Sequence, residues 1–199
     1  MGAINAAMVK QLREKSGAGI MDCKEALTEC NGDMDKSIEF LRKKGLATAQ
    51  KRAGRSTSEG VVQAYIHMGG KIGVMVEVNC ETDFVAKSDD FKDFAKNIAM
   101  HIAAPSPVGI SQEDVPQEVV DREMDITRAQ AKEMGKPDKI IDKIAEGKLS
   151  KFYKESCLMN QAYVRDPDKT ISDYLNEVIA KTGEKISIKR FARYQIGES

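Results

Sequence analysis

Apolar residues recur at helical spacing in three short segments at the start of the chain. The first predicted helix covers residues 5–15, the second begins near Asp22, and the third runs from Asp33 to about Gly45. Asp22 and Glu25 have the spacing of a capping box at the start of the second helix. Because the loops between them are short, the three helices must pack as a compact bundle with a small core.

A polar and basic stretch follows this bundle. Residues 47–58 are rich in small and charged side chains, which is typical of a helical extension that runs into a flexible linker. The basic run Lys51-Arg52-x-x-Arg55 is a candidate RNA contact, but a solvated linker is favoured because the whole chain is neutral. We therefore predict a helical domain with its linker over residues 1–55 and a second domain over residues 56–199.

The pattern changes from helical to strand-like in the second domain. Residues 60–68 and 71–79 are both rich in Val and Ile, and the Gly69-Gly70 pair between them predicts a hairpin with a two-residue turn. A third alternating segment, residues 185–197, must pair with this hairpin, since a lone strand cannot satisfy its backbone. The sequence thus predicts a small antiparallel sheet.

Four further helices are predicted from apolar periodicity between the hairpin and the last strand. They cover residues 89–104, 116–134, 137–157 and 170–181. A break is expected near Gly147-Lys148. Helices packed on one face of an antiparallel sheet, after an N-terminal helical bundle, place the chain in the α+β class.

The hexapeptide Glu81-Thr82-Asp83-Phe84-Val85-Ala86 joins the second strand to the helix that follows. A connection of this kind has an exposed tip and a rigid base, so Phe84 there is poised to enter another molecule. The alternative is that Phe84 turns inward and seals its own core, as most phenylalanines do. Spacing along the sequence leaves both possibilities equally open.

Charge and composition exclude several classes of partner. The chain has 31 basic and 31 acidic residues, so it lacks the general attraction for phosphate on which nucleic-acid binders rely. Tryptophan is absent and aromatic residues make up only 6%, which leaves few platforms for stacking bases. The first residues lack the pattern of a secretory signal, and no apolar run is long enough to span a bilayer. We expect a cytoplasmic protein with no membrane partner and no direct nucleic-acid partner.

The sequence contains none of the common catalytic or metal-binding motifs. Its only histidines are His67 and His101, and zinc-protease, hydrolase and P-loop motifs are missing. The four cysteines form no C-x-x-C pair, so neither a redox motif nor a zinc site is visible. A thiol-dependent site built on Cys80 is an alternative, although most such residues fill cores and surfaces. We expect a binding or regulatory protein with no catalytic residue, cofactor or metal.

Two segments resemble the signatures of bacterial elongation factor Ts. The first covers residues 9–27, VKQLREKSGAGIMDCKEAL, and the second covers residues 77–86, EVNCETDFVA. Further similar segments at His101-Ile102-Ala103-Ala104, at Gly135-Lys136-Pro137 and over residues 191–198 extend the resemblance along the whole chain in order.

This resemblance implies a guanine nucleotide exchange factor for elongation factor Tu, the GTPase that carries aminoacyl-tRNA to the ribosome. It implies that the N-terminal helices form a ubiquitin-associated-like module, which binds the nucleotide domain of the GTPase in its GDP-bound and nucleotide-free states. The segment expected to dislodge magnesium from the GTPase consists of Thr82, Asp83, Phe84 and Val85. The residues expected to bind the partner elsewhere are Arg13, Ile20, Met21 and His101.

Two of these residues have alternative assignments. Asp83 either adds a carboxylate close to the cation site or caps the short helix that presents Phe84. His101 either touches the GTPase or lies in the interior of an amphipathic helix.

Longer members of the family carry a second, degenerate copy of the core module, which this chain lacks. A single copy suggests a homodimer, in which a second chain replaces the missing half, and a two-to-two complex with the GTPase. The alternative from another class is a ubiquitin-associated-like or RNA-binding adaptor without exchange activity. Its affinity for RNA would fall steeply with salt.

Overall fold

The computed structural model describes residues 4–198, which form two compact units. One unit joins the chain up to Met100 with the segment from Asp173 onward, and the other spans His101–Ser172. This division into units does not fall at the domain boundary that the sequence predicted after residue 55. That boundary stays a prediction.

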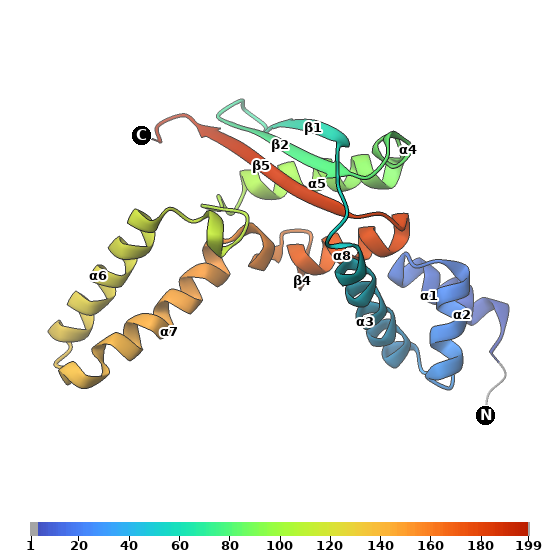
Figure 1. Cartoon of the computed structure of the whole chain (residues 1–199), viewed down its shortest axis with the longest axis horizontal. Coiled ribbons are helices and arrows are strands. Elements are labelled where there is room, and N and C mark those ends of the chain that lie inside the picture. Colours follow the sequence, from blue (N-terminus) through green and yellow to red (C-terminus); the bar gives the residue numbers. More distant parts are fainter. Residues whose placement is uncertain (1–3, 199) are drawn as a thin grey trace. The chain divides into compact units, whose positions relative to one another are not determined.

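Three helices begin the first unit, as predicted (Figure 1). They are α1 (Ala6–Ser16), α2 (Ile20–Glu29) and α3 (Met34–Arg52). The side chains of Asn5 and Asp33 cap α1 and α3, because each accepts a hydrogen bond from a backbone N–H in the first turn. The buried core of the bundle is small and consists of Leu12, Cys23, Ala26 and Leu27.

Two details of the bundle differ from the prediction. The carboxylates of Asp22 and Glu25 accept hydrogen bonds from Lys44 Nζ at 2.8 and 2.6 Å, so they join α2 to α3 instead of capping α2. Helix α3 continues past Gly45, which is buried and close to the backbone of Asn176. Close packing at Gly45 therefore outweighs the low helix propensity of glycine.

The antiparallel sheet has the strand order β1-β2-β5. Its strands are β1 (Glu59–Ile66), β2 (Ile72–Cys80) and β5 (Ile186–Gln195), so the last strand pairs with the hairpin as predicted. The hairpin loop is longer than the expected two residues, since the N–H of His67 donates to the carbonyl of Ile72 and residues 68–71 form the turn. Gly69 and Gly70 both have positive φ, which explains why glycines stand there.

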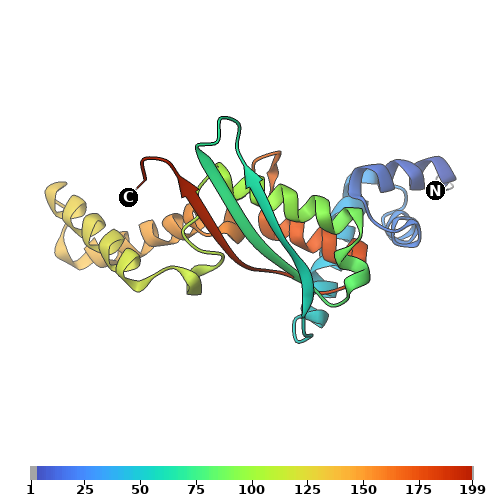
Figure 2. The same cartoon turned by 90° about the horizontal axis from the view of Figure 1, so that it is seen from above.

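Helices α5 (Asp89–Ala103) and α8 (Ile171–Thr182) cover one face of this sheet (Figures 1 and 2). The large, fully buried side chains between the layers include Val74, Val76, Val78, Phe91, Phe94 and Ile98. Tyr174 of α8 packs edge-on against Phe94 and accepts a hydrogen bond from Asn97 Nδ2 at 2.9 Å. The predicted α+β class is confirmed.

The second unit contains a pair of helices, α6 (Gln117–Glu133) and α7 (Asp138–Ser156), that pack against each other. Helix α7 continues through Gly147, so the expected break is wrong. Ile141 and Ala145 are buried on its inner face, and this packing keeps the exposed glycine helical.

Short elements complete the unit around α6 and α7. They are the 3₁₀ turns η1 (Gln112–Asp114) and η2 (Leu158–Asn160) and the strands β3 (Ala162–Tyr163) and β4 (Asp166–Thr170), which pair with each other. The sequence did not predict this ladder, because a two-residue strand is too short to show alternation.

His101, near the end of α5, is fully buried in the second unit. The N–H of Val164 donates to its Nδ1 at 3.3 Å, so Nδ1 must be an acceptor. Its Nε2 lies 3.0 Å from Gln161 Oε1 and therefore carries the hydrogen of a neutral ring. Burial lowers the pKa of His101 below its ordinary value of 6.5, against the smaller opposing effect of the Gln161 hydrogen bond.

We expect the free energy of unfolding to decrease as the pH falls below 6.5. There the unfolded chain takes up a proton on His101 that the folded chain resists, so the unfolded state gains stability. Urea unfolding at neutral and mildly acidic pH measures this loss. The His101→Asn variant keeps an acceptor near the Nδ1 position and should lose less stability on acidification. An equal loss in both proteins would contradict the expectation.

Candidate functional site

The connection between β2 and α5 contains a one-turn helix, α4 (Asp83–Ala86). Thr82 has extended backbone angles at the N-cap position, and its Oγ1 accepts a hydrogen bond from the N–H of Val85 at 3.3 Å. Ser88 precedes α5 and accepts a hydrogen bond from the N–H of Phe91 at 3.4 Å. Each of the two helices therefore begins at a side-chain cap, which fixes the direction of the chain through the connection.

Phe84 points away from the core on α4. Its side chain is 81% exposed, whereas the next two residues, Val85 and Ala86, are buried. The single turn therefore divides its residues between core and surface. The sequence left open whether Phe84 seals its own core or is exposed, and in the structure it is exposed.

Asp83 lies in the first turn of α4, beside the N-cap. Thr82 occupies the capping position, so the alternative that Asp83 caps the helix is wrong. The carboxylate of Asp83 is exposed and pairs with Lys87 Nζ at 2.7 Å. This hydrogen bond, with the charge of Lys87, lowers the pKa of Asp83, so the carboxylate beside Phe84 stays ionised to a more acidic pH.

Glu81 anchors the start of the connection. Its Oε1 accepts the N–H of Lys185 at 2.6 Å, and its Oε2 accepts a hydrogen bond from Arg55 Nη1 at 2.9 Å. The Lys185 hydrogen bond and the nearby arginines lower the pKa of Glu81. The sequence did not suggest this role, because the partners lie far from Glu81 along the chain.

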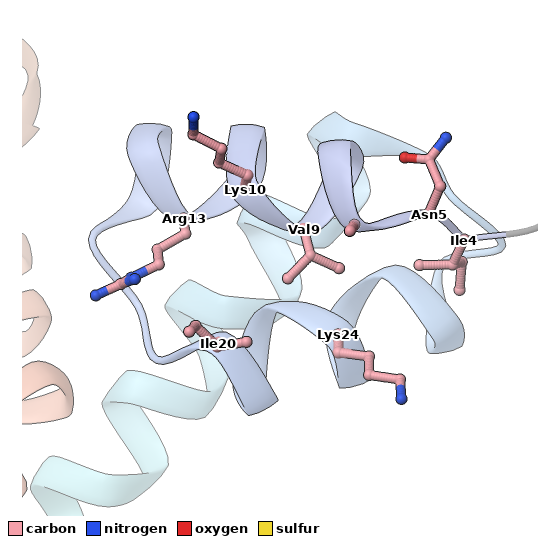
Figure 3. A pocket seen from close by; sticks show the side chains of 8 residues that line it. Ile4, Asn5, Val9, Lys10, Arg13, Ile20 and Lys24 are labelled. Carbon is pink, nitrogen blue, oxygen red and sulfur yellow. The ribbon is translucent and has the colours of Figure 1, made fainter.

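A groove of about 460 Å³ opens between α1 and α2 on the N-terminal bundle (Figure 3). It is lined by Ile4, Asn5, Ala6, Val9, Lys10, Arg13, Ile20 and Lys24. The floor is mainly apolar and the rim carries three basic side chains. The structure thus brings two of the predicted partner-binding residues, Arg13 and Ile20, to one groove, and Met21 is exposed next to Ile20.

His101 is not part of this surface. It belongs to the other compact unit and is fully buried, so its side chain has no exposed area to offer a partner. Its place matches the alternative in which it fills the interior of an amphipathic helix.

Comparison with known proteins gives a match over nearly the whole chain. The family described as Elongation factor TS matches residues 7–198. The chain belongs to the elongation factor Ts family. It is 66% identical over 198 residues to the elongation factor Ts of Desulfosudis oleivorans, with 100% of both chains covered. The elongation factor Ts of Moorella thermoacetica is 60% identical over 195 residues, with 98% of this chain and 96% of the relative covered.

Membership of the elongation factor Ts family settles the class of activity. The chain is a nucleotide exchange factor for elongation factor Tu and acts in translation elongation. It is not an enzyme. Within residues 4–198, no group of His, Cys, Asp and Glu side chains is placed to hold a metal ion.

Cys80, on which the thiol-dependent alternative was built, is poorly suited to nucleophilic attack. It is fully buried, and its Sγ donates to the carbonyl of Thr82 at 3.2 Å. Burial, with the charge of Glu184 as a smaller cause, raises the pKa of the thiol to about 11. Almost no thiolate forms at neutral pH, and the thiolate is the reactive species.

We expect Cys80 to resist alkylation in the folded protein. At pH 8, N-ethylmaleimide should modify the partly exposed Cys30 first and reach Cys80 only after unfolding, as measured by mass spectrometry of peptides. The Cys80→Ser variant should retain exchange activity. Rapid modification of Cys80 in the folded protein, or loss of exchange in the serine variant, would contradict this expectation.

Proposed function

We propose that the chain releases GDP by inserting Phe84 beside the magnesium site of elongation factor Tu. Thr82, Asp83 and Val85 complete the intruding segment. The observation that supports this proposal is the exposed Phe84 on a one-turn helix whose next two residues are buried. An aromatic ring is bulky and rigid enough to displace packed side chains.

Displacement of magnesium would account for release of the nucleotide. The ion bridges the phosphates and offsets their charge, so moving the groups that position it removes much of the binding free energy of GDP. By linkage, GDP weakens the binding of the exchange factor by the same factor. The same cycle works for GTP, and an excess of GTP over GDP then sets its direction.

The N-terminal bundle is proposed to bind the nucleotide domain of the GTPase through Arg13, Ile20 and Met21. Ile20 and Met21 supply exposed apolar area, and the basic rim of the groove fits an apolar surface with acidic residues at its edge. If His101 has a role in partner binding, that role is proposed to be indirect. It would pass through Val164, whose N–H bonds to His101 and whose side chain is partly exposed.

A homodimer is proposed because one face of the sheet carries an exposed group of apolar side chains beside the Glu77–Arg190 ion pair. Cross-strand register and alternation place Val62, Ala64, Ile66, Met75, Ala192 and Tyr194 on the face opposite α5 and α8. Four of these side chains, Val62, Ile66, Met75 and Tyr194, are 53–72% exposed. Contiguous apolar patches of this kind mark interaction sites, and a two-fold axis would let a second copy cover this one. The dimer would then bind two GTPase molecules.

The proposed location is the cytoplasm, without a membrane partner or a direct nucleic-acid partner. None of the helices in the described part of the chain is long and apolar enough to cross a bilayer. The adaptor alternative gains little support from the basic run at the end of α3, since Arg52 and Arg55 both pair with Glu81.

Release of a fluorescent GDP analogue from elongation factor Tu tests the role of Phe84. The intact chain should accelerate release catalytically, and Phe84→Ala should slow it roughly 30-fold, corresponding to about 2 kcal/mol for an interface anchor. Met134→Ala, which truncates an exposed side chain next to α6, is the matched control and should change little. An unchanged release rate for a normally folded Phe84→Ala variant would reject the proposed insertion of Phe84.

Light scattering with size-exclusion chromatography tests the dimer. The intact chain should have twice its sequence mass at micromolar concentration, and Met75→Glu should be a monomer because it places a charge within the apolar patch. Met134→Glu makes the same change outside the patch and should remain a dimer. A monomeric intact chain, both free and bound to elongation factor Tu, would rule the dimer out.

A further inference from the structure

The turn between α8 and β5 contacts the connection that carries Phe84. Glu184 in this turn is half-buried, and its carboxylate accepts three hydrogen bonds. Oε2 binds the N–H groups of Glu81 and Thr82 at 3.1 and 3.0 Å, and Oε1 binds Thr82 Oγ1 at 2.6 Å. A single side chain from a distant segment thus satisfies three donors at the entrance to α4.

We propose that Glu184 is a positioning residue for nucleotide exchange. It holds Glu81 and Thr82 so that the turn bearing Phe84 is formed before the GTPase arrives. This inference rests on the proposed function of Phe84.

The Thr82 hydroxyl links Glu184 to α4. A hydroxyl has one hydrogen, and the short hydrogen bond to Glu184 uses it. The lone pairs of Oγ1 are therefore directed elsewhere, and one accepts the N–H of Val85 to cap α4. Because a helix of one turn is not stable by itself, the oriented cap contributes directly to the position of Phe84.

The contact between the two segments is reciprocal. Glu184 binds the backbone of Glu81, and Glu81 in turn binds the backbone N–H of Lys185 at 2.6 Å. Lys185 Nζ donates to the carbonyls of Ala53 and Arg55 at 2.6 and 2.8 Å, which ties the end of α3 to the same turn. Neither segment can shift alone without breaking charge-assisted hydrogen bonds.

Loss of the Glu184 hydrogen bonds should affect the rate of GDP release more than the binding of the GTPase. Without Glu184, α4 would populate several arrangements, and only the fraction with Phe84 correctly placed would promote release. The groove on the N-terminal bundle would still bind the partner, since Glu184 is not among the residues that line it.

The test measures release of a fluorescent GDP analogue from elongation factor Tu over a range of exchange-factor concentrations. Glu184→Ala removes all three hydrogen bonds and should lower the maximal rate about tenfold, with a much smaller change in the half-saturating concentration. Glu184→Gln keeps one acceptor oxygen and should be intermediate. The control, Glu155→Ala, removes an exposed carboxylate paired with Lys151 and should match the intact chain.

A double variant separates positioning from a general loss of stability. If Glu184 acts through Phe84, then Glu184→Ala should cause no further loss in a Phe84→Ala background. The proposal would be overturned if the loss of rate in the double variant were the product of the two single losses. A normal maximal rate for Glu184→Ala alone would also overturn it. If Glu184→Ala does not fold, the nearly isosteric Glu184→Gln carries the same comparison. If both Phe84→Ala and the double variant release the GDP analogue at the normal rate, the function proposed for Phe84 is rejected instead.

Discussion

Burial of one face of β2 against α5 and α8 is the constraint on which the rest of the first unit depends. Val74, Val76, Val78 and Cys80 alternate into this core up to the last residue of the strand. After Cys80 the chain must turn towards α5 while it keeps Val85 and Ala86 buried. A one-turn helix meets both requirements, and Phe84 is then the residue directed outward.

The same alternation produces the second apolar surface of the unit. Successive side chains of a strand point to opposite faces, so a strand with one buried row carries another row on the other side. In β2 that row includes Met75, with Ala64 and Ala192 beside it on the neighbouring strands. The exposed Phe84 and the proposed dimer face therefore arise from one hydrophobic pattern, and a one-residue change of register would disturb both.

Polar contacts determine how firmly α4 and its Phe84 side chain are held. The core places α4, but the donors at its entrance lie near the surface, where water competes for them. Carboxylates are effective here because each accepts several hydrogen bonds in a defined direction. Glu81 and Glu184 together connect the end of β2 with the start of β5, and the ion pair of Glu81 with Arg52 adds the end of α3.

Much of this molecule could be predicted from local patterns alone. The spacing of apolar residues predicted the bundle, the sheet and the helix after Phe84, because burial of an amphipathic face depends on that spacing. The hexapeptide could be singled out for the same reason. Its residues stand where a strand pattern stops and a helical pattern begins.

The tertiary structure alone decided the details that depend on distant partners. Gly45 and Gly147 stay helical because packing outweighs propensity, and Thr82 rather than Asp83 caps α4. The outward direction of Phe84 and its link to Glu184 belong to the same group. Gly45 lies close to Asn176, and Thr82 is bonded to Glu184 about a hundred residues further along the chain, so no local pattern encodes these contacts.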